Sequence, residues 1–264
     1  MHRGKANLYL LALPLFLSFS NRYYSTMAYH KFFAIAVAAV IAGPLAPSIV
    51  VNDSLSSAPD ATPASLEAIN RLTDDDYARV AGELGVEIAA IKAVSEIEAG
   101  KHHHGFVAVG CPTLNFSVNM FNRNLKRRGI TVSSSQRKRE AAFLPLNRKK
   151  YGSYGAAQHA RLNSAMAIDS VAAITSCYWG MFQIGGFNWK HCGCSSPQEF
   201  AQLMSQSESM QIELFAQFIL RNGAMLKHLR NRNWYAFARI YNGSKRAKSY
   251  ASRMANAYAR YSKQ

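Results

Sequence analysis

The residues best suited to chemistry in this chain are a carboxyl group and two short polar motifs that follow it. Glu98 stands in the segment 94–100, and further on come Gly-Met-Phe-Gln-Ile at 180–184 and Ile-Tyr-Asn-Gly at 240–243. A buried carboxyl group has a raised pKa, because desolvation disfavours its charged form, and it can then donate a proton near neutral pH. Splitting a glycosidic bond requires such an acid, and usually a second carboxylate that supplies a nucleophile or activates water.

A helix must hold Glu98 in a buried position. Thr73 followed by three aspartates predicts the helix start, and Gly100 predicts its end in a left-handed conformation. At about 100° per residue, Glu98 falls on the apolar face and Glu96 points away from it. Glu87 also lies near that face, so the spacing favours Glu98 without singling it out. The alternative for Glu98 is a helix-end glutamate half in solvent. The apolar positions of the face are Val80, Leu84, Ile88, Ile91 and Val94.

The glutamate and the two motifs together form a three-part pattern. Glu98, then Gln183 in Gly-x-x-Gln-Ile, then Tyr241-Asn242 occur in this order. In this the chain resembles lysozyme-like lytic transglycosylases and goose-type lysozymes, and more closely the N-acetylmuramidase domain of phage endolysins and some exported bacterial proteins. The resemblance covers roughly residues 72–261. Further matching pieces are residues 90–100, 105–106, 154–162, 178–186, 207–208, 215–219 and 234–243.

The resemblance implies a lysozyme-like fold and cleavage of peptidoglycan between N-acetylmuramic acid and N-acetylglucosamine, with Glu98 as general acid. It implies that Gln183 hydrogen-bonds a sugar in the cleft and that Tyr241 and Asn242 line the same site. Four aromatic residues offer flat faces for sugar rings, with core packing as the alternative for each of them: Tyr178, Trp179, Phe187 and Trp189.

One position departs from the family. Muramidases carry a segment of the type Pro-x-x-Leu-Phe-Glu-Arg-His, whose glutamate offers another carboxylate, and the aligned segment here has Ser117 and Asn119 in place of the Glu and the His. A serine cannot act as a carboxylate base at neutral pH. Three outcomes follow: Glu98 acts alone, as in lytic transglycosylases; Ser117 holds a water for hydrolysis and joins the substrate-binding residues; or the site only binds glycan.

Cysteines and histidines raise the question of disulfides and metals. Four cysteines are an even number, which suits one or two disulfides in an exported chain. The alternative is a zinc site, but the chain has no CxxC pair and no HExxH run. We therefore expect neither a metal nor a cofactor. The residues in question are Cys111, Cys177, Cys192, Cys194, His191 and the histidines at 102–104.

The charge and composition of the chain limit which classes of binding partner are expected. The chain has 264 residues, 49% of them hydrophobic, and a formal net charge of +16, which favours a polyanionic partner. Nucleic acid, anionic lipid and an anionic cell wall all qualify, but no nucleic-acid-binding motif is present. The expected partners are peptidoglycan glycan strands and not nucleic acid, and we expect a monomer.

The first fifty residues are typical of a targeting segment. An apolar run over 32–51 follows Lys31, so residues 1–51 are interpreted as a signal peptide or a membrane anchor, with Met27 as a possible true start. Residues 52–70 are rich in Ser, Ala, Pro and Asp and predict a linker before an N-acetylmuramidase-like domain at 71–264. Export to the periplasm or the cell exterior follows, with a membrane tether as one form of it.

The remaining segments predict a mainly α, lysozyme-like single globular domain. Residues 114–128 could be helix or strand, and the basic stretch 127–150 is interpreted as a long solvent-facing insertion. Strand-like alternation is scarce and there is no internal repeat. Apolar spacing and capping residues predict helices at 156–175, 197–222, 225–230, 234–241 and 250–261.

Overall fold

The structure, a computed structural model, describes residues 71–99, 104–147 and 155–264. All of these lie in one compact unit, Ala58–Gln264. The predicted targeting segment 1–51, the linker 52–70 and the helix stop at Gly100 fall outside the described residues. Within the described part of the chain, no helix is both long enough and apolar enough to span a bilayer.

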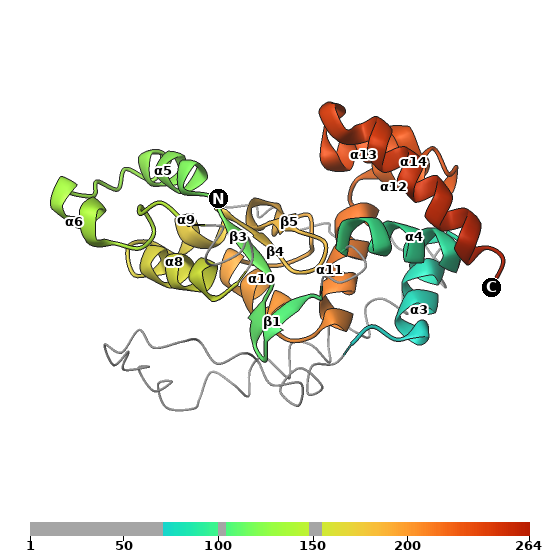
Figure 1. Cartoon of the computed structure of the whole chain (residues 1–264), viewed down its shortest axis with the longest axis horizontal. Helices are drawn as coiled ribbons and strands as arrows, with labels where there is room; N and C mark the ends of the chain where they lie inside the picture. The colour runs from blue at the N-terminus through green and yellow to red at the C-terminus, as the bar shows by residue number, and fades with distance from the viewer. Residues whose placement is uncertain (1–70, 100–103, 148–154) are drawn as a thin grey trace, which may run out of the picture. The chain divides into compact units, whose positions relative to one another are not determined.

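Helices dominate the described residues, as the sequence predicts, and they gather into two groups (Figure 1). Helices α3, α4, α12, α13 and α14 pack on one another, and helices α5, α8, α9 and α10 pack around the strands. Contacts from α11 to α3, α10 and α12 join the two groups. The helices are α3 Asp74–Leu84, α4 Ile88–Ala99, α5 Val118–Arg127, α6 Ser134–Arg139, α8 Ala156–Met166, α9 Ser170–Ile174, α10 Pro197–Met204, α11 Glu208–Leu220, α12 Gly223–Arg230, α13 Trp234–Asn242 and α14 Ser244–Tyr261, with a 3₁₀ turn η1 at Gly186–Asn188.

The single helix predicted from Thr73 to Gly100 is in fact two helices. Thr73 caps α3 as expected, in a capping box with Asp76 whose two bonds measure 3.2 and 2.9 Å. Gly85 then takes the left-handed conformation, with φ of +63°, and ends α3 inside the predicted span. The break turns the apolar face, so that Ile88 is 44% exposed although the other four predicted positions are buried.

A second predicted helix, 197–222, is also divided. Helix α10 ends at Met204, and Ser207 caps α11 by accepting a hydrogen bond of 3.0 Å from the backbone N–H of Met210. Serines in a helix interior compete for backbone hydrogen bonds, which favours such a break. The helix predicted at 156–175 is likewise divided, into α8 and α9, and α14 begins at Ser244, before the predicted start at residue 250. Helices α12 and α13 lie within two residues of their expected bounds.

Among the described residues, five short strands form two antiparallel sheets. Strands β1 Phe106–Ala108 and β2 Cys111–Pro112 pair together, and β3 Leu114–Phe116, β4 Cys177–Trp179 and β5 Ile184–Gly185 form a sheet in the order β3-β4-β5. The ambiguous segment 114–128 is therefore strand followed by helix. The turn between β4 and β5 is the Gly-Met-Phe-Gln-Ile motif, which the sheet thereby fixes at one of its ends.

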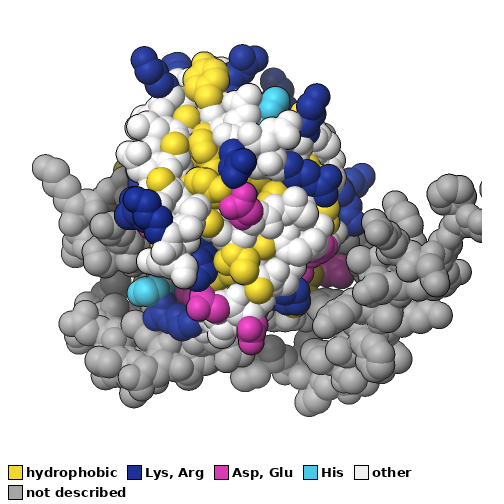
Figure 2. Space-filling model, turned by 90° about the vertical axis from the view of Figure 1, so that its right-hand side faces the viewer, with side chains coloured by type: hydrophobic (Ala, Val, Ile, Leu, Met, Phe, Trp, Pro, Cys, Tyr) yellow, Lys and Arg dark blue, Asp and Glu magenta, His cyan; other side chains and the backbone are white. Residues whose placement is uncertain are grey.

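The basic insertion is exposed along most of its described length. Helix α6 has no buried residue. Val132 and Ala142 nevertheless are buried and attach the segment to the rest of the domain, while residues 148–150 lie outside the described part. Figure 2 shows lysines and arginines scattered over the face that carries α14, among fewer acidic side chains. Positive charge is thus spread over this face of the domain.

Candidate active site

The structure brings Glu98 and Asn242 into direct contact. Glu98 lies in the last turn of α4, and Asn242 is the last residue of α13, which stops at Gly243 with a φ of +78°. The side-chain Nδ2 of Asn242 donates a hydrogen bond of 2.9 Å to Oε1 of Glu98. These two predicted site residues are 144 positions apart in the sequence, and packing of α4 and α13 against α14 joins them.

The environment of Glu98 suits a proton donor. Burial raises the pKa of Glu98 to about 7, and the hydrogen bond from Asn242 and the positive charge of Arg253 offset part of that rise. A carboxyl group with this pKa is protonated in about half of the molecules at neutral pH. Glu96 differs, because Arg260 Nη2 and Tyr261 Oη donate to its carboxylate at 2.6 and 2.9 Å.

Tyr241 connects the glutamate to the glycine-rich turn. Its hydroxyl donates a hydrogen bond of 2.6 Å to the carbonyl of Phe182, within the motif 180–184. Its ring stacks on Phe237 with centroids 5.9 Å apart and meets the ring of Phe215 edge-on at 5.7 Å. Burial raises the pKa of Tyr241 further above its usual range, so the phenol stays neutral and keeps its proton for this bond.

Gln183 adopts an unusual backbone conformation in that turn. Its φ is +48°, in the left-handed region that glycine usually occupies. The side-chain Nε2 donates to the carbonyl of Gly180 at 2.9 Å, which closes the turn on itself. The amide Oε1 has no donor among the described residues, so this oxygen is the part of Gln183 that can accept from a ligand. Strained backbone of this kind gathers at functional sites.

Ser117 lies at the other end of the sheet. Its hydroxyl caps α5 by accepting from Met120 N at 3.4 Å, and its backbone N–H donates to Ser176 O at 2.9 Å. Four strand positions separate Ser176 from Gly180, a span of roughly 13 Å. The described contacts therefore join Glu98, Asn242, Tyr241 and the Gln183 turn, and they do not reach Ser117.

Two buried polar side chains on α11 hold the loops around this site. Gln211, fully buried, accepts from Met181 N at 2.8 Å and donates to Gly105 O at 3.0 Å and Met204 O at 2.9 Å. A Cβ at Gly105 would overlap the Gln211 amide, and a Cβ at Gly180 would lie 2.7 Å from its Oε1. One side chain thus requires glycine in both loops.

Glu208 is the second of these side chains. It is 4% exposed, and it accepts from Gly105 N at 2.9 Å, from Leu72 N at 3.2 Å and from Arg71 Nη1 at 3.5 Å. The sequence showed residues 207–208 only as a matching piece and gave Gln211 no role. Glu208 and Gln211 share one face of α11 with Ile212, Phe215 and Ile219, and polar residues on an apolar helix face are the signal that could have indicated it.

The aromatic residues divide between core and surface. Trp179 is 3% exposed, donates to Ile174 O at 3.1 Å and packs edge-on against Phe200, so core packing is the correct interpretation for it. Phe187 is 49% exposed, and its ring meets that of Tyr178 edge-on at 6.2 Å. Trp189 is partly exposed. Three of the four aromatic residues can therefore offer surface to a ligand.

The cysteines do not form the expected disulfides. All four are free thiols, and Cys177, Cys192 and Cys194 are buried. Burial raises the pKa of Cys194 to about 12, so this thiol is unreactive at neutral pH. Cys192 and Cys194 flank Gly193 in one turn, which is too short a separation for a bridge between them. No three His, Cys, Asp or Glu side chains of the described residues gather in a possible metal site.

Comparison with known proteins identifies the family. The sequence model of the N-acetylmuramidase family matches residues 87–262, a range that holds every candidate site residue. No curated protein sequence matches the chain. Among solved structures, the crystal structure of a Burkholderia AP3 phage endolysin is similar, with a TM-score of 0.62 and 35% identity over 74% of this chain and 72% of that one. The chain therefore belongs to the N-acetylmuramidase family, and it is a lysozyme-like enzyme that degrades peptidoglycan.

Proposed function

We propose that the enzyme cuts the glycan strand between N-acetylmuramic acid and N-acetylglucosamine, with Glu98 as its general acid. The observation that carries this proposal is the pKa of Glu98, which burial raises to about 7, together with its bond to Asn242. General acids work best when their pKa lies near the operating pH. Glu98 is then protonated often enough to donate and acidic enough to release the proton.

The proposed reaction begins with transfer of the Glu98 proton to the glycosidic oxygen. The bond between that oxygen and C1 of the muramic acid breaks, N-acetylglucosamine leaves with a free hydroxyl, and C1 carries the positive charge of an oxocarbenium-like centre. In hydrolysis a water oxygen bonds to C1, and the water proton returns to the Glu98 carboxylate. The product then has a reducing N-acetylmuramic acid end.

A transglycosylase-type outcome of the same site is the alternative. The nearby charge that acts on Glu98 is the Arg253 guanidinium, and no second carboxylate is among the described groups that shift its pKa. Without a base for water, the 6-hydroxyl of the muramic acid can attack C1 and give its proton to Glu98. The product is then an anhydro sugar, lighter than the hydrolysis product by one water.

The other predicted residues would support this chemistry from fixed positions. Asn242 would orient the Glu98 carboxyl group, and the free Oε1 of Gln183 would accept from a sugar amide or hydroxyl. Tyr241 would keep the Gln183 turn against α13 through its bond to Phe182 O. A substrate or water contact of Ser117 stays a prediction, because its hydroxyl already caps α5.

The proposed setting is outside the cytoplasm. Peptidoglycan lies there, and the apolar N-terminal stretch over residues 1–51 suits export, with or without a membrane tether. A net charge of +16 favours an anionic wall, and it is not accompanied by a nucleic-acid-binding motif. We propose that the exported domain acts as a monomer.

Mass spectrometry of the products tests the proposal. Purified protein is incubated with sacculi, and the soluble muropeptides are weighed before and after chemical reduction. Reducible ends support hydrolysis, and products lighter by one water support the transglycosylase outcome. Protein that sediments with sacculi but releases no muropeptides would overturn the proposal in both forms, as would equal release by the Glu98→Gln variant.

A further inference from the structure

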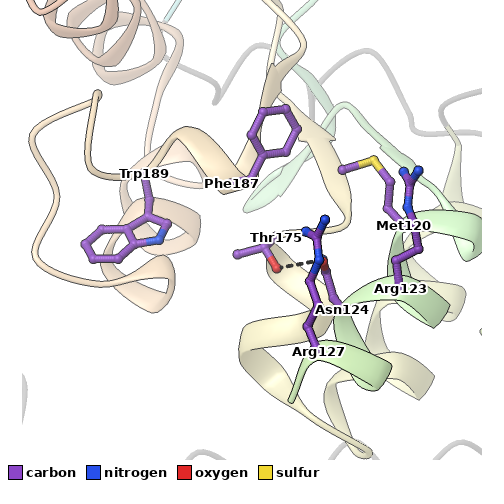
Figure 3. A pocket seen from close by; sticks show the side chains of 7 residues that line it. All are labelled: Met120, Arg123, Asn124, Arg127, Thr175, Phe187 and Trp189. Atoms are coloured by element: carbon purple, nitrogen blue, oxygen red, sulfur yellow. Dashed lines mark hydrogen bonds between the residues drawn. The ribbon is translucent and has the colours of Figure 1, made fainter. Parts of the chain in front are cut away.

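A pocket of about 460 Å³ lies between α5 and the segment that follows the Gln183 turn (Figure 3). Its volume falls in the range of sites for small molecules. One wall is the exposed side of α5, and the other carries two aromatic rings and the end of α9. The residues that line it are Met120, Arg123, Asn124, Arg127, Thr175, Phe187 and Trp189.

The pocket and the Gln183 turn lie at opposite ends of the same three-stranded sheet. Phe187 follows Gln183 by only four positions, through strand β5 and the start of η1. The α5 wall begins at Ser117, directly after strand β3 of the same sheet. The pocket therefore lies about 13 Å from the Gln183 turn, a distance that an extended peptide of about four residues can span from a glycan strand bound there.

Two arginines of α5 give the pocket its charge. Arg123 and Arg127 are one helical turn apart and exposed, and Figure 3 shows both side chains at the α5 wall. Within the described part of the chain neither guanidinium has an ion pair or a hydrogen bond. In contrast, the neighbouring Arg128 pairs with Asp169 at 2.9 Å. Arginine binds carboxylates through two parallel N–H bonds, so this pair can take one or two of them.

The side-chain amide of Asn124, which lies on α5 between the two arginines, is held in a fixed orientation. Nδ2 of Asn124 donates to Thr175 Oγ1 at 3.1 Å and to Ser176 Oγ at 2.9 Å. The Thr175 hydroxyl in turn donates to Val171 O at 2.6 Å. Both amide hydrogens are thus used within the protein, and Oδ1 of Asn124 is left to accept from a ligand N–H.

The opposite wall is apolar and only partly covered. The ring of Phe187 is 49% exposed and is braced by the ring of Tyr178. Lys190 Nζ lies 5.1 Å from the centroid of the Trp189 ring, a cation–π contact. The pocket thus combines arginines that bind carboxylates, an amide oxygen that accepts from N–H groups, and apolar ring faces. A short acidic peptide fits this combination better than an uncharged sugar does.

We propose that this pocket binds the peptide stem of peptidoglycan, with Arg123 and Arg127 taking its free carboxylates and Phe187 and Trp189 contacting its apolar groups. The stem hangs from N-acetylmuramic acid, so the pocket selects muramic units that still carry their peptide. This inference rests on the proposed function, since it assigns the stem of the same substrate. It predicts preference for intact peptidoglycan over glycan strands without peptides.

Kinetics on two soluble substrates test this assignment. One substrate is glycan oligomers with their stems, and the other is the same oligomers after an amidase has removed the stems. The Arg123→Gln/Arg127→Gln double variant should raise KM for the stem-bearing substrate by about tenfold, with kcat unchanged, because two charged contacts are lost. On stem-free oligomers it should match the unmodified enzyme.

A second charge-matched variant separates specific binding from the general effect of charge. Lys138→Gln/Arg139→Gln removes two exposed cations of α6 that lie outside the pocket lining. It should change neither KM. An equal rise in KM on both substrates, or the same rise in the α6 variant, would overturn the assignment to the peptide stem.

A binding measurement with an inactive variant tests the pocket independently of the cleavage reaction. Calorimetry with Glu98→Gln and a soluble disaccharide-peptide should show binding that the added double arginine substitution weakens by about tenfold. Binding in the absence of any cleavage by unmodified enzyme would refute the proposed function and support the pocket. Cleavage without any effect of the arginines on affinity would refute the pocket and leave the proposed function standing.

Discussion

Glu98 and Glu208 are acids near the ends of helices, Glu98 partly exposed and Glu208 buried, and they differ in what surrounds them. Glu208, at the start of α11, receives two backbone N–H groups and an arginine. Glu98, at the end of α4, receives one side-chain amide on one oxygen, and no described donor reaches the other. The first glutamate is fully engaged in holding Gly105 and Leu72, and the second keeps an oxygen for another molecule.

The difference separates a structural acid from a reactive one. A carboxylate that is surrounded by donors fixes the backbone, and removing it leaves buried N–H groups unpaired. A carboxyl group with a raised pKa and few donors holds no backbone group in place, but it can exchange a proton. The substitutions below test whether the two roles are really divided in this way.

The largest expected effect is on the rate of Glu98→Gln. Loss of the general acid should lower muropeptide release by about 10³-fold, since positioned acids contribute on the order of 10²- to 10⁴-fold. Release is measured by chromatography of soluble products at pH 6. Glu96→Gln, on the same helix but paired with Arg260, is the matched control and should keep most of the activity. Comparable losses in both variants would remove Glu98 from its assigned role.

The next effect is on the stability of Glu208→Ala. This change leaves the buried N–H of Gly105 and the partly buried N–H of Leu72 without acceptors, so the free energy of unfolding should fall by about 3 kcal/mol. Urea denaturation followed by circular dichroism gives the value. Glu98→Gln in the same assay should unfold no earlier than the unmodified protein. If the two variants lose equal stability, the division between the two glutamates is wrong.

The pH dependence of the free energy of unfolding should show the titration of Glu98. Its pKa is raised from 4.5 to about 7, so the folded state holds this proton more tightly than the unfolded chain. The stabilising contribution is complete below pH 4.5 and is lost as the pH rises through 7, a change of at most about 3 kcal/mol. Comparing denaturation of the unmodified protein and Glu98→Gln from pH 4.5 to 8 isolates it. A constant difference between them across this range would contradict the raised pKa.

Ser117→Ala should cost about 1 kcal/mol, the usual effect of losing a helix cap. If the hydroxyl serves only α5, the balance between reducing and anhydro products should stay unchanged in this variant. Mass spectrometry of the products checks this. A shift from reducing to anhydro ends would show that Ser117 holds the hydrolytic water.

The smallest expected effect is a displacement of the pH profile in Asn242→Ala. The bond from Asn242 lowers the pKa of Glu98, so its loss should raise that pKa and move the alkaline limb of activity to higher pH. The limb of the unmodified enzyme should lie near pH 7. Initial rates between pH 5 and 9 measure it, and an unchanged limb would mean that Asn242 does not act on Glu98.

The sequence predicted which helix carries Glu98 better than the framework that surrounds that helix. Glu98 was placed on a buried helix face from local periodicity, and the contact with Asn242 agrees with the three-part pattern. The helix break at Gly85 was missed, because a glycine within an apolar repeat can continue a helix as well as end it. The exposure of Ile88 followed from that break.

Contacts distant in sequence were harder to predict. Gln211 reaches Gly105 across 106 positions, and no local pattern indicates which loop a buried amide will bind. The disulfides expected from an even cysteine count did not form, because a count says nothing of where the thiols lie in space. The strands were not predicted, because segments of two or three residues are too short to show an alternating pattern.

The bonds of Gln211 to both Gly105 and Met181 have a consequence for how this enzyme can change over generations. The amide occupies the space that a Cβ would need at Gly105 and at Gly180, so neither glycine can be replaced while Gln211 remains. A shorter residue at 211 would leave the backbone groups of both loops unpaired, and Gly180, with a φ of +69°, would still require glycine. Substitution at any of these three positions should therefore disturb the loops on both sides of the site.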